Sequence, residues 1–193
     1  MKEVSLSGSP RENVGKKDAK AVRNAGNVPC VLYGSGEQTH FSAKLLDLER
    51  IVYTPDVYKI NITVGGKKSS AIIQERQHDP VTDRIRHIDF LEVNDKKAIK
   101  VALPVRIKGS SPGVLAGGKL QQVFRTLKVV GLTKDIPAEV TLDISKLEIG
   151  NAIRVKNIEL KGVQLLDPAS AVVVSIKMAR GAKKADAAEP AKK

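Results

Sequence analysis

The chain of 193 residues is long enough for one large domain or two small ones, and its formal net charge of +12 favours a polyanionic partner such as nucleic acid or an anionic membrane face. It contains no apolar run of the roughly 18 to 20 residues that a membrane span needs, no signal peptide and only one cysteine, Cys30, which together favour an intracellular protein without disulfide bonds. The absence of Trp and the presence of only three Tyr and three Phe argue against a deep aromatic pocket for a small-molecule substrate.

The first half of the chain is rich in β-strand signals. The segment VYKINITV alternates apolar and polar residues, and the turn GGK leads from it into KSSAIIQERQ, which predicts a hairpin. Other segments have strand composition (VPCVLYG, THFSAK, RIRHIDFLEV) or helical spacing (KKDAKAVRNAG, which ends at Gly26, and AKLLDLERIVY). About six strands with two short helices predict a small barrel or half-barrel that ends near Val93.

A second β region follows the short polar connection NDKKAIK. Its expected strands are IKVALPVRIKG, LQQVFRTLKVVGL, AEVTLDI, AIRVKNIEL and ASAVVVSIKM, at a spacing typical of an antiparallel sandwich or mixed β domain. From Ala179 onward no large apolar residue is present to offset the entropy of ordering the chain. We therefore predict a mostly β protein with a barrel domain in 1–96, a second antiparallel β domain in 97–178 and a disordered basic tail in 179–193.

Charge is distributed unevenly over these three parts. Residues 1–96 hold 15 basic and 13 acidic side chains, residues 97–178 hold 13 and 6, and residues 179–193 hold 5 and 2. The positive excess thus lies mostly outside the first part. Overall charge would steer the protein toward a polyanion, but a specific site has to be inferred from local clusters.

The segment GVLAGGKL matches the first positions of a phosphate-binding loop. Gly113, Gly118 and Lys119 have the required spacing, but Leu120 stands where a Ser or Thr should hold magnesium. The segment also lacks the strand-then-helix context of such loops. We interpret it as a Gly-rich loop between strands, and no cofactor is predicted.

The segment QERQHDPVTDRIRHIDF concentrates titratable side chains. His78, Asp79, Asp83, His87 and Asp89 lie within twelve residues and invite comparison with a metal or acid–base cluster. No third ligand at suitable spacing and no nucleophile accompanies them, so no metal or catalytic residue is predicted. A solvated sheet face and a surface that recognises a polar ligand are the other two interpretations.

Strand geometry favours recognition of a polar ligand by this segment. His87 and Asp89 are two residues apart and therefore point to the same face of a strand, while the intervening Ile88 points to the core. Gln74 and Gln77 lie nearby on the preceding strand. Together they predict a polar sheet face with donors and acceptors.

The basic helix and the strand after it supply a second candidate surface. Lys16, Lys20 and Arg23 are three to four residues apart on the expected helix, so we expect them to form one cationic edge that suits a phosphate backbone, although such faces are also often merely solvated. The strand ends in Tyr33 and Gly34, a ring and a residue that allows close backbone approach. RNA-binding sheets use both for stacking or sugar contact.

Four segments in order resemble a known family. GKKDAKAVRNAGNVPCVLYG is similar to its Gly-Lys pair, basic helix and strand that ends in Tyr-Gly, and QHDPVTDRIRHIDFLEV to its Gln and His-Pro-Val turn before His-Val-Asp-Phe. SPGVLAGGKLQQVFRTLKV and DISKLEIGNAIRV resemble signatures of its longer members. The family is the bacterial large-subunit ribosomal protein L twenty-five, in the two-domain form known as CTC or general stress protein. The resemblance covers roughly residues 4–178.

This resemblance implies a structural protein of the large ribosomal subunit, not an enzyme, whose N-terminal barrel binds 5S ribosomal RNA in the cytoplasm. Basic residues would meet the RNA backbone, the strand end would touch it, and the sheet face would read its minor groove. The implied contacts are Arg11, Lys16, Lys20, Arg23, Tyr33, Gly34, Gln74, Gln77, His87 and Asp89. No cofactor, metal, membrane or small-molecule substrate is implied.

The chain departs from the family pattern in the helix and at one turn, and two other functions stay open. Lys20 and Ala21 stand where the family usually has two adjacent Arg, and His78 and Asp79 stand where it has Arg and His, which weakens one cationic contact. A stress-related protein that binds a protein partner off the ribosome is the first alternative, and sedimentation with large subunits would distinguish it. A metal-dependent enzyme built on His78, His87 and Asp89 is the second, and metal analysis would test it.

Overall fold

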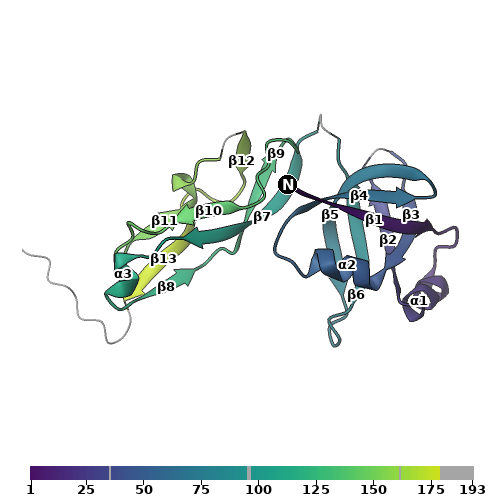
Figure 1. The fold of residues 1–193 in the computed structure, drawn as a ribbon, viewed down its shortest axis with the longest axis horizontal. Coiled ribbons are helices and arrows are strands. Elements are labelled where there is room, and N and C mark those ends of the chain that lie inside the picture. The colour runs from purple at the N-terminus through teal and green to yellow at the C-terminus, as the bar shows by residue number, and fades with distance from the viewer. Residues whose placement is uncertain (35, 95–96, 161, 179–193) are drawn as a thin grey trace, which may run out of the picture. The chain divides into compact units, whose positions relative to one another are not determined.

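The computed structural model describes residues 1–34, 36–94, 97–160 and 162–178 (Figure 1). The predicted disordered tail, residues 179–193, lies outside these ranges. The chain divides into two compact units: Met1–Pro104 with Lys128–Glu139 and Leu160–Leu166, and Val105–Leu127 with Val140–Glu159 and Asp167–Lys193. The domain boundary expected at residue 96 stays a prediction.

The N-terminal part is a closed six-stranded barrel with two short helices, as the sequence predicts. Its strands are β1 (Lys2–Pro10), β2 (Asn27–Tyr33), β3 (Thr39–Lys44), β4 (Tyr58–Val64), β5 (Lys67–His78) and β6 (Ile85–Glu92). They follow the order β1-β3-β2-β6-β5-β4, and a β1–β4 pair closes the barrel. The β1–β4 and β2–β6 pairs are parallel, and the other pairs are antiparallel. Helix α1 (Lys16–Asn24) precedes β2, and α2 (Leu45–Val52) follows β3.

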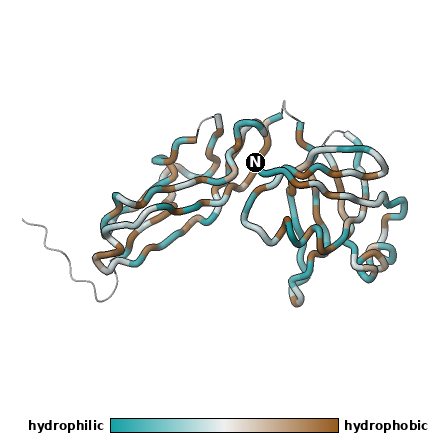
Figure 2. Tube along the Cα trace, in the orientation of Figure 1, coloured by the Kyte–Doolittle hydropathy of each residue, from teal (hydrophilic) through white to brown (hydrophobic). Residues whose placement is uncertain are grey.

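Alternation along the strands builds the barrel core. In β4, Ile60 and Ile62 are buried while Asn61 between them is exposed, and the same change of brown and teal runs along the barrel strands in Figure 2. At the centre, the rings of Phe41 and Phe90 lie 5.6 Å apart and are tilted by 36°. Neither ring is exposed to solvent. This core is the main apolar stabilisation of the barrel.

Strand β1 is an element that the sequence analysis does not predict. Its sequence, KEVSLSGSP, contains Ser, Gly and Pro, which are typical of loops, and Leu6 is its only fully buried large side chain. Pairing with both β3 and β4 makes it a strand. Gly8 is required there, because a Cβ atom would lie 2.5 Å from Cδ2 of Phe41.

Cys30 lies on β2 with no solvent exposure, and burial raises the pKa of its thiol to about 12. We therefore predict that the folded protein resists alkylation at pH 8, because the thiolate is the reactive form and both access and ionisation are suppressed. In denaturant the thiol regains an ordinary pKa of about 8.5 and should react quickly. Iodoacetamide labelling followed by mass spectrometry, with and without urea, measures this; equal rates in the two conditions would contradict it.

The described residues of the second β region form seven strands in two sheets. They are β7 (Ile99–Lys108), β8 (Gly118–Gln122), β9 (Thr126–Gly131), β10 (Val140–Asp143), β11 (Ala152–Arg154), β12 (Val163–Leu165) and β13 (Val172–Met178). One sheet has the order β10-β7-β9-β12 and the other β11-β13-β8. The expected antiparallel pairing holds for β11–β13, β12–β9 and β13–β8, whereas β10 and β7 are parallel. A 3-10 turn (Val155–Asn157) follows β11.

Two segments of this region differ in detail from their expected form. The run LQQVFRTLKVVGL is divided into β8 and β9, because the N–H groups of Val123 and Phe124 both turn to the carbonyl of Val173. Where we expected a Gly-rich loop, Pro112–Leu115 form a one-turn helix, α3, with the hydroxyl of Ser111 accepting from the Gly113 N–H. The segment 113–119 leads into a strand, β8, and not into the helix that follows a phosphate-binding loop. No helix in the described part of the chain is long and apolar enough to span a membrane.

Candidate nucleic-acid interface

The outer face of β6 carries a row of polar side chains shared with β5. The register pairs Gln77 with His87 and Glu75 with Asp89, and residues paired across strands point to the same face. Ile88 is fully buried, so His87 and Asp89 point outward together as expected. We define Tyr33, Glu75, Gln77, His87 and Asp89 as the polar face.

A close contact between His87 and Asp89 orders the centre of the polar face. Nδ1 of His87 lies 2.7 Å from Oδ1 of Asp89, with the two side chains 26% and 29% exposed. A ring N–H at Nδ1 can donate to this carboxylate oxygen. The pair therefore presents an imidazole edge and a carboxylate in fixed relative positions.

Tyr33 belongs to the same face through the β2–β6 pairing. The register places Val31 beside Asp89 and Tyr33 beside Leu91. Partial burial, followed by the nearby carboxylates of Asp89 and Glu75, raises the pKa of the Tyr33 phenol. The phenol therefore stays a neutral hydrogen-bond donor at the polar face.

Glu75 is a member of this face that the sequence analysis missed. The β5–β6 register shifts between Ile73 and Glu75, so the predicted site residue Gln74 occupies an irregular position without a partner on β6. Gln74 is exposed, but the residue opposite Asp89 is Glu75. Nothing in the local sequence marks this bulge, which explains the difference.

Gly34 has a backbone role at the end of β2. Its φ is +134°, and a Cβ atom there would lie 3.1 Å from the carbonyl oxygen of Glu92. The glycine thus lets the chain leave β2 close against the end of β6. Its contact with RNA stays a prediction.

Helix α1 presents an exposed row of lysines. Lys16, Lys17 and Lys20 are exposed and form no ion pair with any described residue; we define them as the lysine face. Lys16 and Lys20 are one turn apart, as expected, whereas Lys17 is an addition. The helix has no fully buried residue, so little of it is held by apolar packing.

Arg23 differs from the two predicted lysines because it turns toward the barrel. It is half-buried, and its Nε donates a hydrogen bond of 3.1 Å to the carbonyl oxygen of Arg86 on β6. Burial, followed by the charges of Arg86 and Arg11, lowers the pKa of its guanidinium. Three guanidinium groups therefore lie near one another where α1 meets the start of β6.

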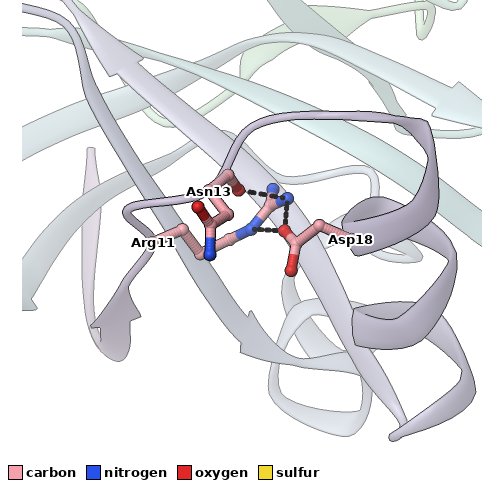
Figure 3. Close-up of polar contacts among 3 residues, drawn as sticks. All are labelled: Arg11, Asn13 and Asp18. Carbon is pink, nitrogen blue, oxygen red and sulfur yellow. Dashed lines mark hydrogen bonds and ion pairs between the residues drawn. The ribbon is translucent and has the colours of Figure 1, made fainter.

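Arg11 is an ion-paired residue rather than a freely exposed cation. Its Nε donates to Oδ2 of Asp18 over 3.1 Å, and its Nη2 contacts the same carboxylate oxygen and the carbonyl of Asn13 (Figure 3). Only 10% of the Arg11 side chain is exposed. The family resemblance implies a contact between Arg11 and the RNA backbone, and this geometry gives Arg11 an intramolecular partner.

The turn between β5 and β6 is organised by Asp79. Its Oδ1 accepts from the N–H groups of Val81 (3.1 Å) and Thr82 (3.2 Å), and these bonds lower the pKa of its carboxyl. Oδ2 lies 3.5 Å from a guanidinium nitrogen of Arg86. Asp79 therefore stabilises the turn through its own carboxylate.

His78 and Asp83 also belong to this turn and not to the polar face. Nδ1 of His78 lies 3.1 Å from the carbonyl oxygen of Asp83, which also accepts a 2.8 Å bond from the hydroxyl of Tyr53. The expected cluster thus separates into a turn and a sheet face. Among the described residues, no three His, Cys, Asp or Glu side chains are grouped so that they could hold a metal ion.

Comparison with known proteins gives matches along almost the whole chain. Residues 6–90 match the model of the ribosomal L25p family, and residues 98–180 match that of the ribosomal protein TL5 C-terminal domain. The chain is 41% identical over 185 residues to "Large ribosomal subunit protein bL25" of Porphyromonas gingivalis, covering 95% of this chain and 96% of the relative. Proteins of the same name from Cytophaga hutchinsonii and Bacteroides thetaiotaomicron are 38% and 37% identical, each covering 97% of this chain and 98% of the relative.

Proposed function

Because the chain belongs to the ribosomal L25p family, as a structural protein of the large ribosomal subunit, we propose that it binds 5S ribosomal RNA and stabilises the folded RNA. The lysine face of α1 would contact the phosphate backbone, and the polar face of β5, β6 and β2 would contact the minor groove. Family membership also confirms that the protein is not an enzyme and that it resides on the ribosome in the cytoplasm.

The observation that carries the proposal is the hydrogen bond from Arg23 to the carbonyl oxygen of Arg86. It ties the last turn of α1 to the residue directly before His87. The cationic helix is thereby tied to the strand that carries the centre of the polar face. A helix that binds phosphates and a sheet that reads base edges could then engage the same RNA segment.

The chemistry of the polar face suits an RNA duplex. A-form RNA presents 2′-hydroxyls and base edges in a wide, shallow minor groove, whereas its major groove is too deep and narrow for side chains. Carboxylate oxygens of Asp89 and Glu75 can accept from 2′-hydroxyl or base amino groups, and Gln77 can both donate and accept. A sheet face with these groups fits a shallow groove better than a deep one.

The lysine face would supply the part of the affinity that does not depend on sequence. Each lysine that neutralises a phosphate releases a condensed counterion, so binding weakens as salt rises. All of the proposed contacts lie in residues 1–96, the part of the chain with nearly balanced charge. We propose that this part is the RNA-binding domain and that the positive excess of 97–178 serves other contacts within the subunit.

The salt dependence of binding tests this assignment. We predict that Lys16→Ala and Lys20→Ala each weaken 5S RNA binding and reduce the slope of log K against log salt by about one. Filter binding of the full chain at several salt concentrations measures the slope. Lys100→Ala removes an equally exposed lysine from β7 and should leave the slope unchanged. Equal slopes for parent, Lys16→Ala and Lys20→Ala would mean that the lysine face is only solvated.

A further inference from the structure

We infer that Arg11 and Asp18 form a positioning pair that holds the first turn of α1 against the barrel, and that Arg11 acts on RNA through the placement of this helix. Asp18 is thereby assigned a role, although it is an acidic residue on a helix whose proposed ligand is a polyanion. The inference rests on the proposed binding of RNA by the lysine face.

Arg11 is fixed at both its backbone and its side chain. Its backbone N–H donates a 3.0 Å hydrogen bond to the carbonyl of His40 on β3, which ties this position to the barrel. Its guanidinium holds Asp18 through two nitrogens and the carbonyl of Asn13 through one (Figure 3). A guanidinium that uses its planar fork on one carboxylate is a rigid link between the end of β1 and α1.

Helix α1 has few other contacts that hold it in place. It is nine residues long, and an isolated helix of fewer than about 12 to 15 residues is marginal in water. None of its residues is fully buried, and Gly15 at its N-cap provides no side-chain cap. Apart from the half-buried Ala19 and Val22, the helix is held by Asp18 near its start and Arg23 near its end.

Loss of Asp18 changes the RNA affinity in opposite directions depending on whether Asp18 positions the helix or only adds negative charge. If Asp18 only adds negative charge near the phosphates, its removal strengthens RNA binding. If Asp18 places the lysine face, its removal weakens RNA binding because Lys16, Lys17 and Lys20 lose their common orientation. Asp18 also lies in the first turn, where a negative charge stabilises the helix.

The test compares Asp18→Asn with Glu12→Gln in the full chain. Glu12 is an exposed acidic neighbour that makes no ion pair with a described residue. We expect Asp18→Asn to weaken 5S RNA binding about three- to tenfold, which lies toward the lower end of the coupling energies of contacting residues. Glu12→Gln should leave the affinity unchanged or slightly higher. Stronger binding by both variants would overturn the inference.

A double-mutant cycle with Arg11→Ala separates positioning from direct phosphate contact. A positioning pair predicts that the Arg11→Ala, Asp18→Asn variant binds no more weakly than Arg11→Ala alone, since the link is already broken. It also predicts that Arg11→Ala lowers the salt slope by more than one, because several lysines are displaced together. A slope change of one with additive affinities would show a direct contact by Arg11 and refute positioning.

Amide hydrogen exchange in the RNA-free protein distinguishes this inference from the proposed function. The N–H of Ala19, which donates to Gly15, and that of Ala25, which donates to Ala21, report on the two ends of α1. Asp18→Asn should accelerate exchange at Ala19 more than at Ala25. Unchanged exchange would overturn the positioning pair. Faster exchange together with unchanged RNA binding would instead refute the proposed role of the lysine face.

Discussion

Replacement of Phe41 by Ala is expected to lower the free energy of unfolding by about 3 to 5 kcal/mol, the range for deletion of a buried aromatic side chain. Phe41 has no solvent exposure, and its ring packs 5.6 Å from that of Phe90. Its other side fills the space that Gly8 leaves open on β1. The variant would therefore lose contacts with both β1 and β6.

Urea denaturation followed by circular dichroism, with Cys30 labelling as a second probe on the barrel, measures this loss. Leu46→Ala is the matched control, because Leu46 is a large apolar residue of the same barrel with 70% of its surface exposed. Its substitution should change stability by less than about 0.5 kcal/mol. Similar losses for the two variants would mean that the Phe41–Phe90 pair is not the centre of the core.

Replacement of Asp89 by Asn is expected to weaken 5S RNA binding by about 1.5 to 3 kcal/mol, the value of a hydrogen bond to a charged group. The change keeps the shape of the side chain and one acceptor for Nδ1 of His87. It removes a negative charge, and relief of repulsion at a wet surface would strengthen binding by about 1 kcal/mol or less. Loss of the hydrogen bond is therefore the larger effect, and the net result is weaker binding of 5S RNA.

Competition between 5S RNA and an unrelated duplex shows whether discrimination is lost along with affinity. Asp47→Asn serves as the control, since it removes the same charge from α2, where no RNA contact is proposed. Its binding should equal that of the parent. If Asp89→Asn binds 5S RNA as tightly as the parent or more tightly, Asp89 does not read RNA and the polar face loses its central residue.

The sequence by itself determined the elements that local patterns encode. Alternation in VYKINITV and the Gly65–Gly66 turn identified the β4–β5 hairpin, and helical spacing identified α1 and α2. Two-residue spacing placed His87 and Asp89 on one face, because the side-chain period of a strand is a local property. The order of four signatures was sufficient to identify the family, which the comparisons confirm.

Only the tertiary structure decided what depends on partners distant in the chain. Strand β1 exists because β3 and β4 provide its hydrogen bonds, and the parallel β7–β10 pair likewise has no local signal. The bulge that exchanges Gln74 for Glu75 opposite Asp89 arises from strand pairing. The environment of the cations also depends on tertiary structure. The packing of the helix determines whether Arg11 contacts solvent or a carboxylate, and helical spacing alone cannot predict which of the two it contacts.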